Sequence, residues 1–255
     1  FQLPALELPG LTLVISPLIA LMKDQVDALQ ANGVAAEFIN SSLAPADITR
    51  IQAAAKSGKL KILYIAPERL ASRDFRDYLQ SLQVSLIAID EAHCISEWGH
   101  DFRPEYRNLR ELRKLFPQVP LIALTATATS KVRDDIITQL KLQKAKVFVS
   151  GFNRPNLHLK VIEKKGAYSK LVTLLKKYQG ESVIVYCFSR KDTDKLAADL
   201  KREGHKVLAY HAGLPADKRK KHQELFIRDE VNIIIATIAF GMGIDKSNVR
   251  FVVHM

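Results

Sequence analysis

The sequence predicts an α/β protein made of two units, each built on a parallel sheet. Short apolar runs recur along the 255 residues with amphipathic segments between them, and most runs are continuous rather than alternating. Continuous runs are typical of strands buried on both faces, and strands that alternate with helices favour parallel sheets. The pattern is interrupted near residues 151–156, where a Gly, a Pro and two Asn occur. We therefore expect a first unit over 1–150, a linker over 151–156 and a second unit over 157–255.

The apolar runs place the strands. In the first unit we expect strands over Leu11–Ser16, Leu60–Ala66, Val84–Ile89, Pro120–Leu124 and Lys146–Val149. In the second unit we expect them over Leu157–Val161, Ser182–Phe188, Lys206–Tyr210, Val231–Ala236 and Val249–Val253.

Two of the intervening helices have clear sequence signals. Between Pro17 and Gly33, an apolar stripe with helical spacing predicts a helix that Gly33 can end, and the stripe consists of Ile19, Met22, Val26 and Leu29. Ser189 precedes a second helix, and Asp192 three residues later forms a pattern similar to a capping box.

Composition restricts the functional class only broadly. No apolar run approaches the roughly eighteen residues of a bilayer-spanning helix, so we expect no membrane role. Cys94 and Cys187 lack the paired spacing of a zinc site, which favours two reduced thiols and no zinc in this chain. The net charge is +11, with 18 Lys and Arg against 16 Asp and Glu in residues 1–150, and 20 against 11 in residues 151–255. A basic second unit fits a polyanionic partner, but solvated helix faces explain the same charge equally well.

Two adjacent carboxylates, Asp90 and Glu91, follow the expected strand over Val84–Ile89. Ionised groups that leave a buried strand are costly unless they are paired or bind a metal. In phosphoryl transfer the first carboxylate can hold Mg²⁺ through water, and the second can orient and deprotonate the attacking water. The alternative is a solvent-facing acidic turn. The presence of Thr125-Ala126-Thr127 after another strand favours catalysis.

A loop with aromatic and charged residues follows the carboxylate pair. It contains the only tryptophan of the chain, Trp98, in a polar stretch with Gly and Pro over residues 94–106. Aromatic side chains interleaved with Arg and His are suited to stacking on bases and contacting phosphates. The alternative is an aromatic loop that folds back on the sheet.

These segments resemble a known family. Asp90-Glu91-Ala92-His93 resembles the DEAH box, motif II of superfamily 2 helicases, and Thr125-Ala126-Thr127 resembles motif III. The loop over residues 94–106 is similar to the aromatic-rich loop of RecQ helicases. The resemblance implies two RecA-like lobes, both incomplete here, in which His93 acts with the two carboxylates. It also implies four residues that couple DNA binding to ATP hydrolysis: Trp98, His100, Phe102 and Arg103.

Other segments resemble further helicase motifs in the family's order. Residues 16–25 resemble motif Ia, 64–70 motif Ib, 185–190 motif IV, 210–214 the family's YHAGL segment and 237–245 motif V. The resemblance implies DNA contacts by Ser16, Lys23, Arg69, Ser189, Arg190 and Thr237. It implies coupling to ATP by Thr125, Thr127, Gly243 and Asp245. Gly241 and Gly243 permit a close backbone approach. We assign no catalytic role to His211.

The resemblance implies an ATP- and Mg²⁺-dependent helicase that moves 3′ to 5′ on single-stranded DNA, unwinds duplex DNA and acts in repair or recombination. We expect it in the cytoplasm of a prokaryote or the nucleus of a eukaryote. The alternatives are an RNA helicase of the same superfamily and a non-catalytic nucleic-acid-binding protein. No phosphate loop of the type G-x-x-x-x-G-K-[ST] occurs in the chain. We expect that loop before Phe1 and motif VI after Met255, so the 255 residues alone should hydrolyse ATP poorly or not at all.

Overall fold

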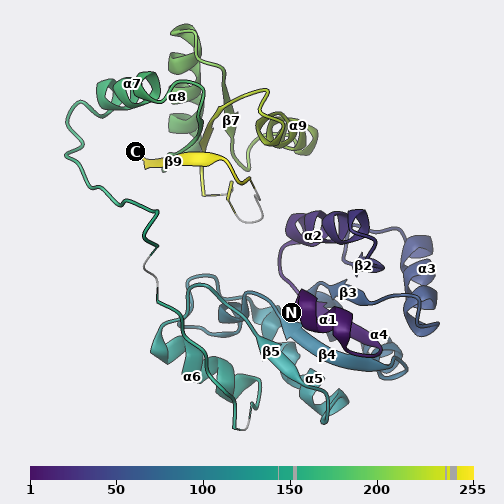
Figure 1. Ribbon diagram of the computed structural model, residues 1–255. Helices are drawn as coiled ribbons and strands as arrows, with labels where there is room; N and C mark the ends of the chain where they lie inside the picture. The colour runs from purple at the N-terminus through teal and green to yellow at the C-terminus, as the bar shows by residue number, and fades with distance from the viewer. Residues whose placement is uncertain (143, 152–153, 239, 242–245) are drawn as a thin grey trace. The chain divides into compact units, whose positions relative to one another are not determined.

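The computed structural model describes residues 1–142, 144–151, 154–238, 240–241 and 246–255. The chain divides into two compact units, Phe1–Ser150 and Gly151–Met255 (Figure 1). Each unit contains a sheet in which every pair of neighbouring strands is parallel, with helices packed against it. The predicted α/β class is therefore confirmed.

The first unit has a five-stranded sheet with the order β2-β3-β1-β4-β5. Its strands are β1 (Leu11–Ile15), β2 (Ala36–Ile39), β3 (Ile62–Ile65), β4 (Val84–Ile89) and β5 (Leu121–Ala123). Its helices are α1 (Gln2–Glu7), α2 (Ile19–Ala31), α3 (Pro45–Lys56), α4 (Arg73–Gln80), α5 (Arg110–Leu115) and α6 (Ser130–Gln139). Short 3₁₀ helices are η1 (Pro67–Ala71), η2 (Ala92–Ile95) and η3 (Pro104–Leu109).

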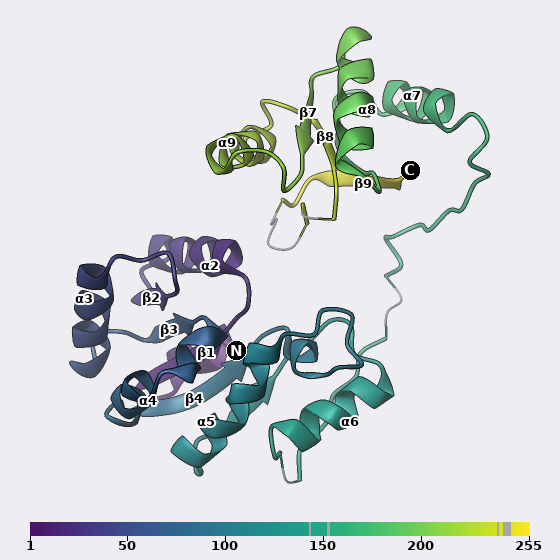
Figure 2. The same cartoon turned by 180° about the vertical axis from the view of Figure 1, so that it is seen from behind.

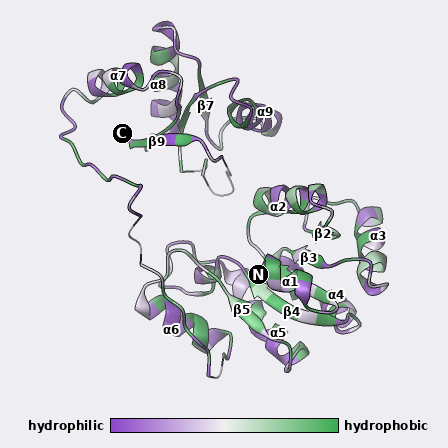
Figure 3. Cartoon of the chain, in the orientation of Figure 1, coloured by the Kyte–Doolittle hydropathy of each residue, from purple (hydrophilic) through white to green (hydrophobic). Residues whose placement is uncertain are grey.

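Helices cover both faces of this sheet. One face packs against α3, α4, α5 and α6, and the other against α1 and α2 (Figures 1 and 2). Within β1, Leu13 and Ile15 point into the first layer and Val14 into the second. Burial on both faces explains why the strand sequences are continuously apolar. Figure 3 shows the same division, because the strands are mostly green whereas helices such as α3 and α6 carry both colours.

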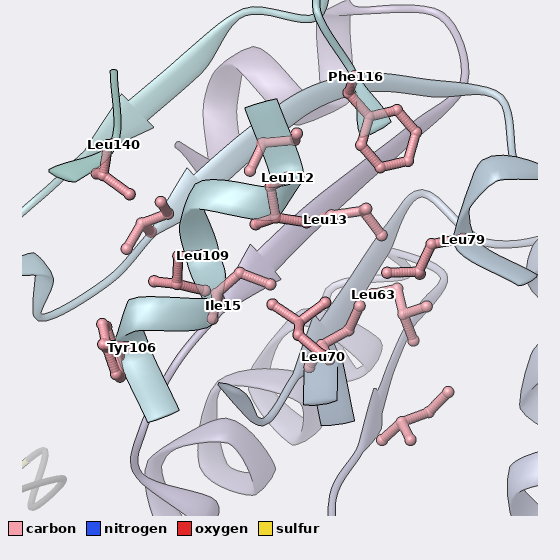
Figure 4. Close-up of a cluster of buried hydrophobic side chains, with 14 of the residues drawn as sticks. Leu13, Ile15, Leu63, Leu70, Leu79, Tyr106, Leu109, Leu112, Phe116 and Leu140 are labelled. Atoms are coloured by element: carbon pink, nitrogen blue, oxygen red, sulfur yellow. The ribbon is translucent and has the colours of Figure 1, made fainter. Parts of the chain in front are cut away.

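The larger core layer joins strand and helix side chains. In Figure 4, Leu13, Ile15 and Leu63 from the strands meet Leu109 and Leu112 from η3 and α5. All five side chains are completely excluded from solvent. This packing fixes the strand ends, where the polar residues begin.

The second unit has a four-stranded sheet with the order β7-β8-β6-β9. Its strands are β6 (Ser182–Tyr186), β7 (Val207–Tyr210), β8 (Ile233–Ala236) and β9 (Val249–His254). Its helices are α7 (Ala167–Lys177), α8 (Arg190–Arg202) and α9 (Ala216–Ile227). Helices α7 and α8 pack on one face, and α9 packs on the other.

The two helix signals in the sequence are confirmed. In α2, Met22, Val26 and Leu29 are buried as predicted, although Ile19 at the first turn stays 41% exposed. The helix ends in a Schellman arrangement, because Gly33 N–H donates to Gln30 O (2.9 Å) and Val34 N–H to Leu29 O (2.9 Å). Gly33 has φ +78°, a value that glycine adopts without strain.

Two predicted strands are wrong. Lys146–Val149 and Leu157–Val161 are irregular, and their apolar side chains are exposed, Phe148 by 89% and Val161 by 99%. A strand needs a neighbouring strand for its backbone hydrogen bonds, and neither segment has one in the described parts of the chain. The sequence analysis also missed β2 and α1, which are short. No helix in the described ranges is both long enough and apolar enough to cross a bilayer.

Candidate functional site

Asp90 and Glu91 directly follow β4, a strand inside the first sheet. β4 pairs with β1 on one side and β5 on the other, and Ile89 lies opposite both Ile15 and Ala123. The N–H of Asp90 donates to Ile15 O (2.8 Å), which extends the sheet by one residue. Both carboxylates therefore leave the sheet at its carboxyl edge, where parallel α/β folds bind ligands.

Glu91 adopts a left-handed backbone conformation, with φ 46° and ψ 45°. Such a conformation costs a non-glycine residue on the order of 1–3 kcal/mol. The neighbouring hydrogen bonds hold it: Glu91 N–H donates to Asp90 Oδ1 (3.0 Å), and Ala92 N–H donates to Leu124 O at the end of β5 (2.8 Å). The fully buried Tyr106 adds a third restraint, because its hydroxyl donates to Asp90 O (3.0 Å). The turn thus leaves the Glu91 carboxylate beside His93.

His93 connects this turn to the segment after β5. Its Nδ1 lies 2.8 Å from Thr125 Oγ1, 3.2 Å from Glu91 Oε2 and 3.5 Å from Thr127 Oγ1. The imidazole is 4% exposed, and burial lowers the pKa of His93. The structure therefore brings together Glu91, His93, Thr125 and Thr127, which the sequence analysis selected separately.

Burial raises the pKa of Asp90, and burial together with the Asp90 charge raises the pKa of Glu91. Asp90 forms no ion pair with any side chain in the described ranges. A partly buried carboxylate without a cationic partner fits a divalent cation, because oxygen ligands suit Mg²⁺. The residues present therefore fit a magnesium site at Asp90.

A second group of possible metal ligands does not fit a metal as well. His93, Cys94 and Asp101 offer ligand atoms within 4.8 Å of one another. Burial raises the pKa of the Cys94 thiol to about 12, so the thiolate that a metal requires is unfavourable. The Asp101 carboxylate already pairs with Arg103, whose charge would repel a cation. We make no metal assignment to this group.

The loop after η2 folds back on the turn. His100 stacks on His93, with ring centroids 4.4 Å apart and planes 17° from parallel. Gly99 lies so close that a Cβ atom there would be 2.5 Å from His93 O. Arg103 connects the loop to the segment after β1, because its Nη1 donates to Pro17 O (3.1 Å). The predicted loop residues are thus in direct contact with the DEAH-type segment.

Two aromatic side chains of the loop lie beside cations. The Arg107 guanidinium lies 5.1 Å from the centroid of Phe102, and Lys131 Nζ lies 3.0 Å from the centroid of Trp98. Trp98 is 65% exposed, unlike the aromatic residues of the core. The sequence analysis missed Lys131, because no motif marks a residue 33 positions away as a neighbour of Trp98.

A group of buried polar atoms lies at the carboxyl ends of β1, β2 and β3. Ser16 and Asn40 directly follow β1 and β2, which flank β3 in register. The Asn40 O atom accepts from Arg69 Nη2 (2.5 Å). Ser16 Oγ, Asn40 Nδ2 and Arg69 Nε are buried without a hydrogen-bond partner among the described residues. Asn40 was not selected from the sequence. Lys23 lies on α2 and pairs with Asp27.

In the second unit, Ser189 and Thr237 lie at the carboxyl edge of the sheet. Ser189 caps α8, and its Oγ accepts from Asp192 N–H (3.0 Å), as the sequence predicted. Arg190 lies beside Gly213, since a Cβ atom there would be 3.2 Å from Arg190 Cδ. Thr237 follows β8, and its N–H donates to Tyr210 O (3.1 Å).

Two further features of the second unit bear on the sequence predictions. The predicted close approach at Gly241 is present, because a Cβ atom would be 2.6 Å from the hydroxyl of Tyr186. His211 is buried between Asp194 and Gly213 N–H, in a structural arrangement. Gly243 and Asp245 lie outside the described residues.

Two parallel α/β units, the first with a DEAH-type turn bonded to a Thr-Ala-Thr segment, define the class of RecA-like helicase lobes. Residues 1–136 match the family model described as DEAD/DEAH box helicase, and residues 166–255 match the helicase conserved C-terminal domain. The chain belongs to the DEAD/DEAH box helicase family.

Curated relatives are similar over the whole chain. The chain is 49% identical over 254 residues to the ATP-dependent DNA helicase RecQ of Pasteurella multocida, covering 100% of the chain and 40% of that protein. It is 49% identical over 255 residues to RecQ of Bacillus subtilis, covering 100% and 43%. The chain thus spans less than half the length of these relatives.

Solved structures share the fold at low identity. The helicase MrfA bound to DNA has a TM-score of 0.74 at 16% identity, with 100% of this chain and 38% of that chain covered. Dbp5 of S. cerevisiae bound to RNA and ADP BeF3 has a TM-score of 0.67 at 18% identity, with 96% and 62% covered. Because these identities are low, the likeness concerns the fold alone.

Proposed function

We propose that this chain is the core of an ATP-dependent DNA helicase of the RecQ type. The observation that carries the proposal is the contact of His93 Nδ1 with both Glu91 Oε2 (3.2 Å) and Thr125 Oγ1 (2.8 Å). This contact joins a carboxylate pair suited to phosphoryl transfer to a segment after the next strand. The similarity to proteins named RecQ DNA helicases supports DNA as the nucleic acid.

In the proposed reaction, Asp90 would hold Mg²⁺, and Glu91 would orient and deprotonate the water that attacks the γ-phosphate. When bound, Mg²⁺ would supply positive charge that offsets the charge of the phosphate groups. Burial already raises the pKa of Glu91, which makes its carboxylate a stronger base than an exposed one. The left-handed turn at Glu91 holds the side chain in place for this role.

Nucleic-acid binding is proposed for two places in the first unit. Ser16, Asn40 and Arg69 lie at the carboxyl ends of β1, β2 and β3, the edge where parallel α/β folds bind ligands, and the partly exposed Arg69 is the side chain of this group that a phosphate can reach. The loop around Trp98 offers an exposed aromatic face for a base. In the second unit, taken by itself, we propose that Ser189, Arg190 and Thr237 contact a nucleic-acid backbone.

Several finer properties belong to the same proposal. We propose translocation in the 3′ to 5′ direction, a role in repair or recombination, and the cytoplasm or nucleus as the location. We propose slow ATP hydrolysis by these 255 residues alone, because the sequence contains no phosphate loop.

The test uses Glu91→Gln in a protein that contains this chain together with a phosphate loop. The variant should bind ATP normally but lose at least about 100-fold in hydrolysis, a typical contribution of one general base, and it should not unwind a duplex. Glu7→Gln, which neutralises an exposed carboxylate at the end of α1, is the matched control and should change neither property. Normal unwinding by Glu91→Gln would overturn the catalytic assignment. Stronger stimulation by single-stranded RNA than by DNA would instead favour an RNA helicase.

A further inference from the structure

The ammonium of Lys131 lies on the face of the only tryptophan in the chain. Lys131 Nζ is 3.0 Å from the centroid of the Trp98 ring, within the range of a cation–π contact. Lys131 is the second residue of α6, and Trp98 lies in the loop after η2, so the contact joins two separate segments. α6 begins five residues after Thr125, one of the His93 partners.

Helix stability does not explain a lysine at this position. The first turn of a helix carries the positive end of the macrodipole, so a cation there is unfavourable. No acidic residue stands in the first turn of α6 to compensate, and Lys131 forms no ion pair among the residues described. Among the residues described, the Trp98 ring is the group that the structure places against this ammonium.

The Trp98 ring has few other restraints. Its backbone is held, because Trp98 N–H donates to Ser96 Oγ (3.3 Å) and Gly99 N–H to Ser96 O (2.9 Å). The indole itself makes no ring contact with another aromatic residue in the described ranges. It is 65% exposed although Lys131 covers one face, so the opposite face is open to solvent.

We propose that Lys131 is a positioning residue that fixes the Trp98 ring from behind, so that the opposite face is presented to a base of single-stranded nucleic acid. An aromatic side chain already fixed in its binding orientation loses less conformational entropy when a base stacks on it. Lys131 itself does not contact the base. This inference rests on the proposed function, because it assumes that a base stacks on Trp98.

The first test needs no nucleic acid. Trp98 is the only tryptophan of the 255 residues, so its emission reports on this site alone. Lys131→Ala should lower the fluorescence anisotropy of Trp98 and raise its quenching by acrylamide, and Lys131→Arg should restore both values because arginine also stacks on indole. Lys59→Ala, which removes an exposed lysine elsewhere in the same unit, should change neither. Unchanged anisotropy in Lys131→Ala would overturn the proposal.

The second test separates a base contact from a phosphate contact. Binding of a labelled oligothymidylate by the chain should weaken about 2- to 5-fold in Lys131→Ala, as expected for an exposed cation–π contact. With an abasic oligonucleotide of the same length, Lys131→Ala should weaken binding no more than Lys59→Ala. An equal loss on both oligonucleotides would show that Lys131 contacts phosphate and would overturn its positioning role.

The two tests also distinguish this inference from the proposed function. If oligothymidylate neither changes the emission of wild-type Trp98 nor binds more tightly than the abasic strand, base stacking on the loop is rejected and the positioning role is rejected with it. If wild-type Trp98 responds but Lys131→Ala binds oligothymidylate as wild type does, only the role of Lys131 fails.

Discussion

The Nδ1 atom of His93 lies 2.8 Å from Oγ1 of Thr125, 32 residues further along the chain. One residue follows β4 within the DEAH-type turn, and the other follows β5. Because β4 and β5 are adjacent parallel strands, their carboxyl ends lie side by side and the two polar side chains meet.

This hydrogen bond should be measurable as a coupling energy. Thr125→Val should lower the free energy of unfolding by about 0.5–1.5 kcal/mol, the usual net value of one hydrogen bond. In a His93→Phe background the same substitution should cost less, because the His93 partner is already absent and only the bond from Thr127 N–H to Thr125 Oγ1 (3.2 Å) is lost. Urea unfolding followed by Trp98 emission measures both, since Trp98 lies in the same unit. Thr127→Val should cost less than Thr125→Val, because the exposed Thr127 hydroxyl is 3.5 Å from His93 Nδ1, at the limit of a hydrogen bond. Equal costs for Thr125→Val in both backgrounds would contradict the coupling.

Gly99 should be sensitive to the smallest substitution. A Cβ atom there would lie 2.5 Å from His93 O and 3.1 Å from Ser96 O, both backbone atoms that cannot rotate away. Gly99→Ala should therefore destabilise the first unit by about 1–3 kcal/mol, the usual cost of overpacking.

Gly151→Ala is the matched control for this change. A Cβ atom at Gly151 meets nothing within 4 Å, so the free energy of unfolding should change by no more than about 0.5 kcal/mol. Urea unfolding again provides the measurement. A Gly99→Ala protein as stable as wild type would mean that the loop does not pack on His93.

Asp90 should destabilise the metal-free protein at neutral pH. Burial raises the pKa of Asp90, so above the ordinary carboxyl pKa of about 4 the native chain holds a proton that the unfolded chain has released. The free energy of unfolding therefore falls as the pH rises from about 4 through the raised pKa of Asp90. Above that pKa it stays at its lower value. Asp90→Asn should remove this loss and, at about pH 7, stabilise the chain by more than the roughly 0.5 kcal/mol of a typical surface substitution.

Measurements at two pH values without added Mg²⁺ test this prediction. The gain from Asp90→Asn should shrink at about pH 3, below the ordinary carboxyl pKa, where wild-type Asp90 is largely protonated in the unfolded chain and, because its pKa is raised, in the native chain as well. Glu68→Gln, an exposed neutralisation on η1, should be neutral at both values. A gain that is equal at the two pH values would show that the charge of Asp90 is not its cause.

Much of this site could be predicted from the sequence, because residues that directly follow parallel strands lie at the same edge of the sheet. Asp90 and Thr125 were selected because each follows a continuous apolar run, and parallel pairing then places such residues together. Apolar runs do not say which strands pair, however. Leu157–Val161 has a strand-like sequence, yet no described strand lies beside it, and its residues stay exposed. The short β2 was missed because Ala36–Ile39 is only four residues long and contains a glutamate.

Contacts between loops could not be predicted from the sequence, for a different reason. The His93–His100 stack and the Lys131–Trp98 contact depend on how a loop with Gly99 folds back on η2. No periodicity encodes such a fold, since it arises from backbone packing rather than from alternation of side chains. The left-handed conformation of Glu91 is similar, because the residue type alone does not predict it.

Ser189 should serve both the stability of α8 and, by our proposal, nucleic-acid binding, and the two roles can be separated. Its Oγ accepts from Asp192 N–H (3.0 Å), so Ser189→Ala should destabilise the helix by about 0.5–2 kcal/mol. Aspartate also caps helices well, but it adds negative charge where a phosphate would bind. Ser189→Asp should therefore keep more of the protection of the first α8 amides in hydrogen exchange than Ser189→Ala, although it loses the bond that Ser189 Oγ donates to Asp192 Oδ2 (2.7 Å), and it should weaken oligonucleotide binding. Equal loss of protection in both variants would show that the cap geometry is wrong, and unchanged binding by Ser189→Asp would remove Ser189 from the proposed interface.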